Sequence, residues 1–262
     1  MPAPAAKSAA NAAAALAQAV ALFNAGQPGV AHQACRLALA SQPAHPGWLQ
    51  LLATLQLAGG DPAAALASIE PVLARHPGHA PAQRLASQAT LGLAEQLLAR
   101  QQPQAAAALL QALVQAQPGS SQAWYGWGVA LHASRQPQAA RQALLRAIAL
   151  DPQPAPPWFA LALVCEDLQA HDEAAAALAQ VLARQPEHVE ARLNLGLVEQ
   201  ARGRLDAALD QHAQAWQLRP DLLGRIAMAL CSQPCGGVWL TLQGLQHELS
   251  RRLAPAAPLV RR

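Results

Sequence analysis

The chain has 262 residues, of which 53% are hydrophobic and only 13% are charged, and its net charge is +3. So small a net charge is not typical of a nucleic-acid-binding protein, and no uninterrupted apolar run reaches the roughly 18 to 20 residues that a membrane span needs. Alanine dominates and Lys7 is the only lysine, a composition typical of a GC-rich bacterial genome. We therefore expect a soluble, cytoplasmic protein with enough apolar residues for a large core.

The first predicted element is a helix over Ala9–Phe23. With Lys7 before it, this alanine-rich stretch has some features of a secretory signal, but Asn11 and Gln18 interrupt the apolar run. The stretch also fits the spacing of the elements that follow. We interpret it as the first helix of the first repeat.

A regular spacing of prolines organises most of the chain. Intervals of 34, 41, 34, 34 and 34 residues separate Pro43, Pro77, Pro118, Pro152, Pro186 and Pro220. A period of 34 residues is typical of helix-turn-helix solenoids, in which each repeat covers the apolar face of its neighbour. The longer interval adds seven residues within Gln83–Gln102, and we predict that they form two extra helical turns.

Small residues and glycines recur at fixed places in this period. The predicted crossing points of the two helices of a repeat carry Gly128, Ala140, Ala174 and Ala208. A small side chain at such a point lets two backbones approach closely. The predicted turns contain Gly26, Gly60 and Gly203, where glycine supplies the left-handed conformation that ends a helix.

The repeat that ends at Pro152 carries the most specific pattern. It contains Trp124, Trp127, Gly128, Leu131, Ala140, Leu144 and Ala147, and the next two repeats keep this register with Trp158, Leu161, Ala162, Ala174, Leu178, Leu195, Gly196 and Ala208. The pattern resembles the tetratricopeptide repeat. The resemblance implies an all-α, right-handed superhelical solenoid of about six helix-turn-helix repeats that binds proteins and is not an enzyme.

We place the repeat array at residues 8–220. After Pro220 the register is lost, and we predict helices over Leu222–Leu230 and Val238–Leu253 around a turn at Ser232–Gly237. Because a solenoid needs a cap over its last apolar face, we interpret residues 221–254 as a helical cap, with Trp239 as its plug. Residues 255–262 are expected to form a flexible tail.

In the family that the chain resembles, the first helix of each repeat lines a groove for the partner. The matching positions give twelve candidate partner-binding residues: Leu51, Thr54, Tyr125, Val129, His132, Phe159, Leu163, Glu166, Leu193, Asn194, Leu197 and Gln200. Tyr125 and Phe159 share one position in successive repeats, so we interpret them as an aromatic ledge, with burial in the core as the alternative. His132, Glu166 and Gln200 share another position and should form a polar row.

The sequence carries little that points to catalysis. A histidine beside a carboxylate can transfer protons, but the chain has no phosphate-binding loop and no nucleophile or zinc-protease motif. Cys35 and Cys165 fall at packing positions. Cys231 and Cys235 could form a redox pair or half of a metal site, yet no second ligand pair lies nearby, which favours a plain turn. We expect no catalytic residue, no cofactor and no metal.

These observations predict a scaffold or adaptor that holds an apolar or helical segment of a protein partner in its groove. Two alternatives stay open. The chain could act in trans as an accessory subunit of a glycosyltransferase, a methyltransferase or another enzyme, because the residues after Pro220 are too few for a catalytic domain of roughly 100 residues. It could also be a self-associating assembly factor that forms homodimers.

Overall fold

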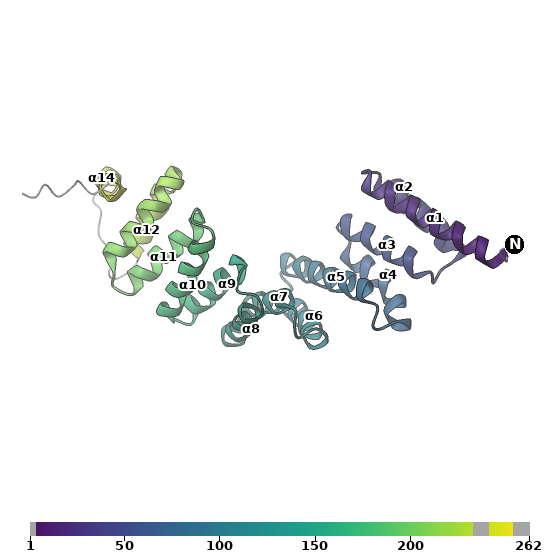
Figure 1. Ribbon diagram of the computed structural model, residues 1–262. Coiled ribbons are helices and arrows are strands. Elements are labelled where there is room, and N and C mark those ends of the chain that lie inside the picture. The colour runs from purple at the N-terminus through teal and green to yellow at the C-terminus, as the bar shows by residue number, and fades with distance from the viewer. Residues whose placement is uncertain (1–3, 233–240, 254–262) are drawn as a thin grey trace, which may run out of the picture. The chain divides into compact units, whose positions relative to one another are not determined.

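The protein was analysed as a computed structural model, which describes residues 4–232 and 241–253. The regular structure of these residues is entirely helical (Figure 1), which confirms the predicted all-α fold. Trp239, Cys235 and residues 255–262, and with them the predicted plug, cysteine pair and tail, lie outside the described residues. The helices are α1 (Pro4–Asn24), α2 (Pro28–Ser41), α3 (Pro46–Ala58), α4 (Pro62–Arg75), α5 (Ala80–Ala99), α6 (Pro103–Ala116), α7 (Ser121–Ala133), α8 (Pro137–Leu150), α9 (Ala155–Asp167), α10 (His171–Arg184), α11 (Val189–Ala201), α12 (Leu205–Leu218), the 3-10 helix η1 (Pro220–Leu222), α13 (Leu223–Ser232) and α14 (Leu242–Leu253).

Six helix pairs, from α1 with α2 to α11 with α12, follow one another with nearly constant dimensions. The second helix of every pair has 14 residues. The first helix has 13 residues in α3, α7, α9 and α11. Three residues join the helices of a pair and four residues join one pair to the next, so the elements account for the 34-residue period.

The seven extra residues of the third repeat lengthen one helix. α5 has 20 residues, whereas its counterparts have 13, and the turns on both sides of α5 keep their usual lengths. Seven residues are about two turns at 3.6 residues per turn. The insertion is therefore the helical extension that the spacing predicts.

The six turns within the helix pairs share one backbone conformation. Their middle residue has a positive φ in every case, between 57° and 78°. Glycine fills this place at positions 26, 60 and 203, whereas Gln101, Arg135 and Gln169 fill it in the other three turns. A residue with a Cβ atom is strained in this conformation, so the chain carries strain in the third, fourth and fifth repeats.

Replacing Arg135 by glycine is expected to raise the free energy of unfolding by about 0.5 to 1 kcal/mol, because glycine adopts a φ of 60° without the clash of a Cβ atom. Urea unfolding followed by circular dichroism measures this gain. The matched control is Gln136→Gly one residue later, where φ is −117° and glycine brings no relief. Equal effects of the two substitutions would contradict the strain argument.

The predicted crossing points are confirmed as sites of close approach. Ala140, Ala174 and Ala208 are fully buried. A Cβ atom added to Gly128 would lie 2.7 Å from Cγ of Leu144, and one added to Gly196 would overlap the ring of His212. The helices of these pairs can pack at this distance only because the crossing residues are small.

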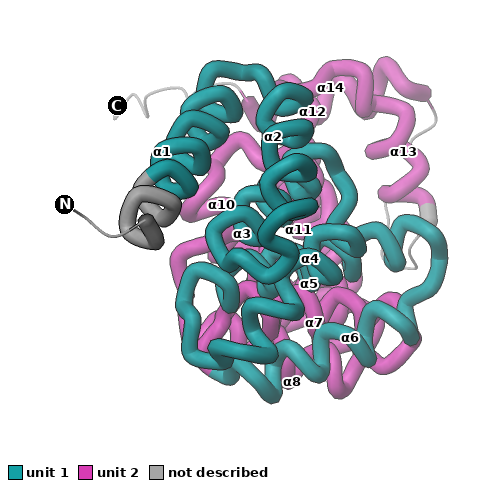
Figure 2. Tube along the Cα trace, turned by 90° about the vertical axis from the view of Figure 1, so that its right-hand side faces the viewer, with its two compact units in different colours: residues 1–118 teal, residues 119–262 magenta. Residues whose placement is uncertain are grey.

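The described chain forms two compact units, residues 1–118 and residues 119–262 (Figure 2). In the first unit, α1 to α3 share a core around Cys35 and Trp48, and α3 to α5 share a second core around Ile69. In the second unit, consecutive helices from α7 to α12 pack against one another. The candidate site lies in the second unit.

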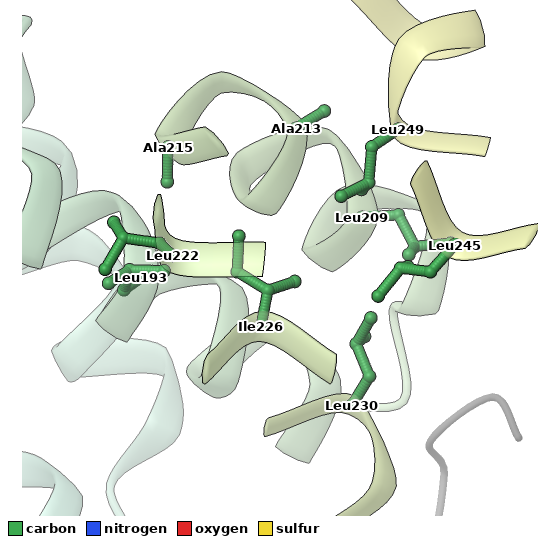
Figure 3. Packing of buried hydrophobic residues seen from close by; sticks show 9 residues of the cluster. All are labelled: Leu193, Leu209, Ala213, Ala215, Leu222, Ile226, Leu230, Leu245 and Leu249. Atoms are coloured by element: carbon green, nitrogen blue, oxygen red, sulfur yellow. The ribbon is translucent and has the colours of Figure 1, made fainter. Parts of the chain in front are cut away.

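The last two helices pack on the end of the second unit. α14 contacts α12, and α13 contacts α11. Figure 3 shows the shared core, in which nine side chains are buried: Leu193, Leu209, Ala213, Ala215, Leu222, Ile226, Leu230, Leu245 and Leu249. α14 begins at Leu242, because Thr241 before it is not helical, so the predicted helix over Val238–Leu253 is wrong at Thr241; Val238, Trp239 and Leu240 lie outside the described residues.

Arg252 adds polar contacts to this packing. Its guanidinium donates hydrogen bonds to the carboxylates of Asp206 and Asp210 on α12, each at 2.8 Å, and to Glu248 on α14 at 2.9 Å. The neighbouring carboxylates hold the pKa of Arg252 above its ordinary value, although burial of the side chain acts in the opposite direction. The arginine therefore stays charged and ties α14 to α12.

Candidate functional site

An apolar pocket of about 290 Å³ opens in the second unit. Its lining comes mainly from α7 and α9, with contributions from α8 and from the connection between α10 and α11. The lining residues are Tyr125, Val129, His132, Leu144, Ala155, Pro156, Phe159, Ala160, Leu163, Val164, Gln185 and His188. Five of the twelve candidate residues from the sequence, Tyr125, Val129, His132, Phe159 and Leu163, therefore meet in one cavity.

The helical repeat explains why these side chains meet. Tyr125 and Val129 lie four residues apart on α7, and Phe159 and Leu163 lie four residues apart on α9. Residues four apart share a helix face, and the 34-residue period brings the same face of successive first helices to one surface. All four side chains are only half-buried. The aromatic pair thus forms part of an accessible surface and is not enclosed in the core.

His188 is a lining residue that the sequence analysis missed. It is the N-cap of α11, and its Nδ1 accepts a hydrogen bond from the backbone N–H of Ala191 at 3.1 Å. Its ring also lies against the ring of Phe159, with 5.0 Å between the ring centres and 34° between the planes. The cap and the ring contact together hold the imidazole in one orientation.

His45 and His79 cap α3 and α5 in the same way and stand at the same place in their repeats, two residues after the repeat proline. This recurrence of histidine was the signal in the sequence that could have identified His188 as a capping residue.

The polar side of the pocket is set by a contact between a histidine and a carboxylate. Nε2 of His132 on α7 lies 2.7 Å from Oδ2 of Asp167 at the end of α9. His132 was expected to lie in a row with Glu166, but its partner is Asp167, the residue after Glu166. The contact joins two successive repeats and fixes the imidazole at the pocket edge.

Comparison with known families decides the identity of the repeat. Two family models, both described as tetratricopeptide repeat, match residues 91–155 and 158–222 in one case and residues 22–89 in the other, which is well over half of the chain. The chain belongs to the tetratricopeptide repeat family. Proteins of this family generally mediate protein–protein interactions, and their fold is typically a non-catalytic scaffold. A comparison with proteins of curated function gave no match.

Several solved tetratricopeptide repeat structures are similar to this chain. MamA is 25% identical with a TM-score of 0.54, and the match covers 65% of this chain and 95% of MamA. YrrB, described as a TPR protein with an unusual peptide-binding site, is 20% identical with a TM-score of 0.57, covering 72% of this chain and 94% of YrrB. PilF of Pseudomonas aeruginosa is 15% identical with a TM-score of 0.58, covering 80% and 92%. The last two similarities concern the fold alone.

Four of the remaining candidates are placed in the interior or bonded to their own helix. Leu51 and Leu193 are buried in hydrophobic cores, 6% and 3% exposed. Gln200 is fully buried, and its Nε2 donates a hydrogen bond to the carbonyl of Leu230 on α13 at 3.0 Å. Thr54 is half-buried and donates its hydroxyl hydrogen to the carbonyl of Gln50 at 2.8 Å. The expectation that Leu51, Leu193 and Gln200 line an open groove is corrected, because neighbouring helices cover all three.

The two other candidates on α11 stay outside the pocket. Asn194 and Leu197 are half-buried and do not contribute to its lining. Since Gln200 is enclosed and His132 pairs with Asp167, the predicted polar row of His132, Glu166 and Gln200 does not form. The candidate residues that line this pocket thus come from α7 and α9 alone.

Glu166 lies on α9 in an environment that opposes its charge. Its Oε1 is enclosed and has no hydrogen-bond partner among the described residues. Burial raises the pKa of the Glu166 carboxyl to about 7, and the adjacent charge of Asp167 adds to the increase. The folded protein therefore favours the neutral acid below this pH.

Glu166→Gln is expected to raise the free energy of unfolding by about 1 to 2 kcal/mol at pH 8, with a smaller gain at pH 5. The folded pKa of about 7 lies above the ordinary value of 4.5, so the stability linked to the proton is complete below pH 4.5 and is lost as the pH rises through 7. Urea unfolding at the two pH values measures the difference. Glu187→Gln, at an exposed carboxylate of the same unit, is the control and should bring no such gain. Identical pH profiles for wild type and Glu166→Gln would contradict this account.

Cys35 and Cys165 are fully buried, as their predicted packing role requires. Burial raises the pKa of both thiols, that of Cys35 to about 11.

Among residues 4–232 and 241–253, no three histidine, cysteine or acidic side chains are grouped so that they could bind a metal ion. The helices in the same residues also include none with the length and apolarity that a bilayer crossing requires.

Proposed function

We propose that this protein is a non-catalytic interaction scaffold that holds a segment of a partner protein in the pocket between α7 and α9. The observation that supports this proposal is the grouping of Tyr125, Val129, Phe159 and Leu163 around one apolar cavity. Half-buried aromatic side chains beside aliphatic ones can still bury a large area when a partner side chain enters. Such side chains are the usual energetic centre of a protein interface.

The polar groups of the pocket suit recognition better than catalysis. His132 is already paired with Asp167, and Nδ1 of His188 is engaged by the backbone of α11. The described lining contains no serine, cysteine or lysine that could act as a nucleophile. These groups can orient a bound segment by hydrogen bonding while the apolar surface supplies the affinity.

A pull-down from native cell extract, analysed by mass spectrometry, tests the proposal. We expect the Tyr125→Ala, Phe159→Ala double variant to lose a defined set of proteins that the wild-type chain retains, because the cavity loses both rings. The matched control is Phe23→Ala, which removes the other phenylalanine of the chain, in the first unit. Circular dichroism must show that all three proteins have the same helicity.

Retention of the same proteins by wild type and double variant would contradict the pocket as the binding site. Light scattering over a range of concentrations separates a partner of different sequence from a second copy of the chain. A mass that rises with concentration for wild type but not for the double variant would identify self-association through this pocket.

A further inference from the structure

In two repeats of this chain, the N-cap histidine of the first helix lies against the first helix of the repeat before it. The residue that the histidine contacts there differs between the two repeats. In the first unit, the N-cap His79 of α5 faces Gln50, the fifth residue of α3, and their side-chain nitrogens lie 3.4 Å apart. In the second unit, the N-cap His188 of α11 faces Phe159, the fifth residue of α9. The aromatic ring of Phe159 offers no hydrogen-bonding group of the kind that the amide of Gln50 supplies to His79.

The geometry leaves one N–H group of His188 available. Because Nδ1 accepts a hydrogen bond from the backbone N–H of Ala191, the neutral imidazole carries its hydrogen on Nε2. Nε2 of His188 has no partner among the described residues and is not enclosed, whereas Nε2 of His79 contacts Gln50. His188 therefore presents an oriented, uncharged donor at the pocket wall.

A second hollow continues from this wall. It has a volume of about 490 Å³ and is lined by Gln185, Pro186, Glu187 and His188, so it shares Gln185 and His188 with the apolar pocket. The side chain of Gln185 is exposed, and its amide makes no hydrogen bond to the described residues. A side-chain amide can donate and accept at once, which matches the N–H and C=O of a peptide backbone.

We propose that the pocket binds its partner as an extended peptide segment, with an apolar side chain in the cavity and the adjoining backbone on His188 and Gln185. Nε2–H of His188 donates to a backbone carbonyl, and the amide of Gln185 pairs with the next peptide group. This inference rests on the proposed function and specifies the conformation of the partner.

An extended segment fits these groups better than a helix does. The backbone N–H and C=O groups of a helix are bonded within the helix, so they could not satisfy His188 and Gln185. An extended segment exposes these groups beside each apolar side chain. Both recognition groups are uncharged, which matches the neutral peptide backbone and requires no charged residue next to the anchor.

The test begins with a displayed library of random dodecapeptides selected on the full-length protein, with counter-selection on the Tyr125→Ala, Phe159→Ala variant. The enriched peptides are synthesised, and their dissociation constants are measured by fluorescence polarisation. His188→Ser removes the Nε2 donor but keeps a capping side chain, as Ser120 caps α7 at the same place in its repeat. Gln185→Ala removes the amide.

We expect His188→Ser and Gln185→Ala each to weaken peptide binding about three- to tenfold. The controls are His79→Ser and Gln42→Ala, which change the equivalent N-cap and C-cap positions in the first unit and should change binding less than about twofold. Placing helix-favouring α-aminoisobutyric acid beside the apolar anchor of the peptide should also weaken binding, because it opposes the extended conformation.

The outcomes separate the two proposals. One outcome would overturn the extended mode and leave the proposed function standing. In it, the selected peptides require Phe159 but bind His188→Ser as tightly as wild type, and α-aminoisobutyric acid in the peptide lowers the dissociation constant. If selection returns no peptide that depends on Tyr125 and Phe159, the proposed function fails and this inference fails with it.

Discussion

Replacing Leu245 by aspartate is expected to lower the free energy of unfolding of the second unit by more than about 4 kcal/mol. Leu245 lies on α14 and is fully buried against Leu209 and Leu230 (Figure 3). Burying a carboxylate there without a partner is unfavourable, and loss of the leucine also removes an apolar contact worth about 1.5 to 3 kcal/mol. Thermal and urea unfolding by circular dichroism measure the loss.

The same helix supplies the control. Leu242 is 55% exposed, so Leu242→Asp changes the chemistry equally without entering the core and should shift stability by no more than about 0.5 kcal/mol. Hydrogen exchange adds a local measurement, since amides of α11 and α12 should lose protection in Leu245→Asp. Equal stability of the two variants would mean that α14 does not hold this core together in solution.

This prediction follows from the role that we propose for the C-terminal helices. Without α13 and α14, the last repeat would expose Leu193, Leu209 and Ala213, and Gln200 would lose the carbonyl of Leu230. A solenoid must cover its terminal apolar face to stay soluble. We therefore propose that residues 221–254 act as the cap of the array, with η1, α13 and α14 as its structural elements.

Features that recur along the array, in some or all of the repeats, could be predicted from the sequence because each has a local cause. A proline at a fixed spacing, a small residue at a helix crossing and a glycine with positive φ each act within a few residues of their position. Gly60 and Gly128 are two such cases. The extension of α5 was predictable because it too is local: the seven extra residues lengthen one helix, and the turns on both sides keep their usual lengths.

The pocket could be predicted only in part. Tyr125 and Phe159 were found because the family register assigns them to one face, whereas His188 acts through a ring contact with a residue 29 positions earlier, in another repeat. Gln200 shows the opposite error: the same position is half-buried in the inner repeats, at His132 and Glu166, but α13 covers it completely in the last one. Such coverage depends on the segment after Pro220, in which the repeat register gives no guide.

His212 is the second residue for which we expect a large effect. It occupies the place of Leu144 and Leu178 in the two preceding repeats, 34 residues apart, and it is fully buried against Gly196. Neither ring nitrogen has a hydrogen-bond partner among the described residues. Burial lowers the pKa of the His212 imidazole to about 4, because the charged form cannot be solvated there.

The sign of the pH effect follows from this shift. The folded pKa of about 4 lies below the ordinary value of 6.5, so the stability linked to neutral His212 is complete above pH 6.5 and is lost as the pH falls through 4. The expected loss between pH 7 and pH 4 is about 3 kcal/mol. Other groups also titrate in this range, so the comparison must be made between variants at each pH.

His212→Leu is expected to stabilise the protein by about 1 to 2 kcal/mol at pH 7, because it removes two buried nitrogens without partners and restores the side chain that Leu144 provides against Gly128. At pH 4.5 the difference in free energy of unfolding between His212→Leu and wild type should grow by roughly a further 2 to 3 kcal/mol. The reason is that only wild type buries an imidazole that binds a proton when the protein unfolds. Urea unfolding at both pH values measures the two differences. His247→Leu, at an exposed histidine on α14, is the control and should show no such widening. A constant difference between His212→Leu and wild type across this range would mean that His212 gains solvent or a partner when it is protonated, and that its packing against Gly196 opens at low pH.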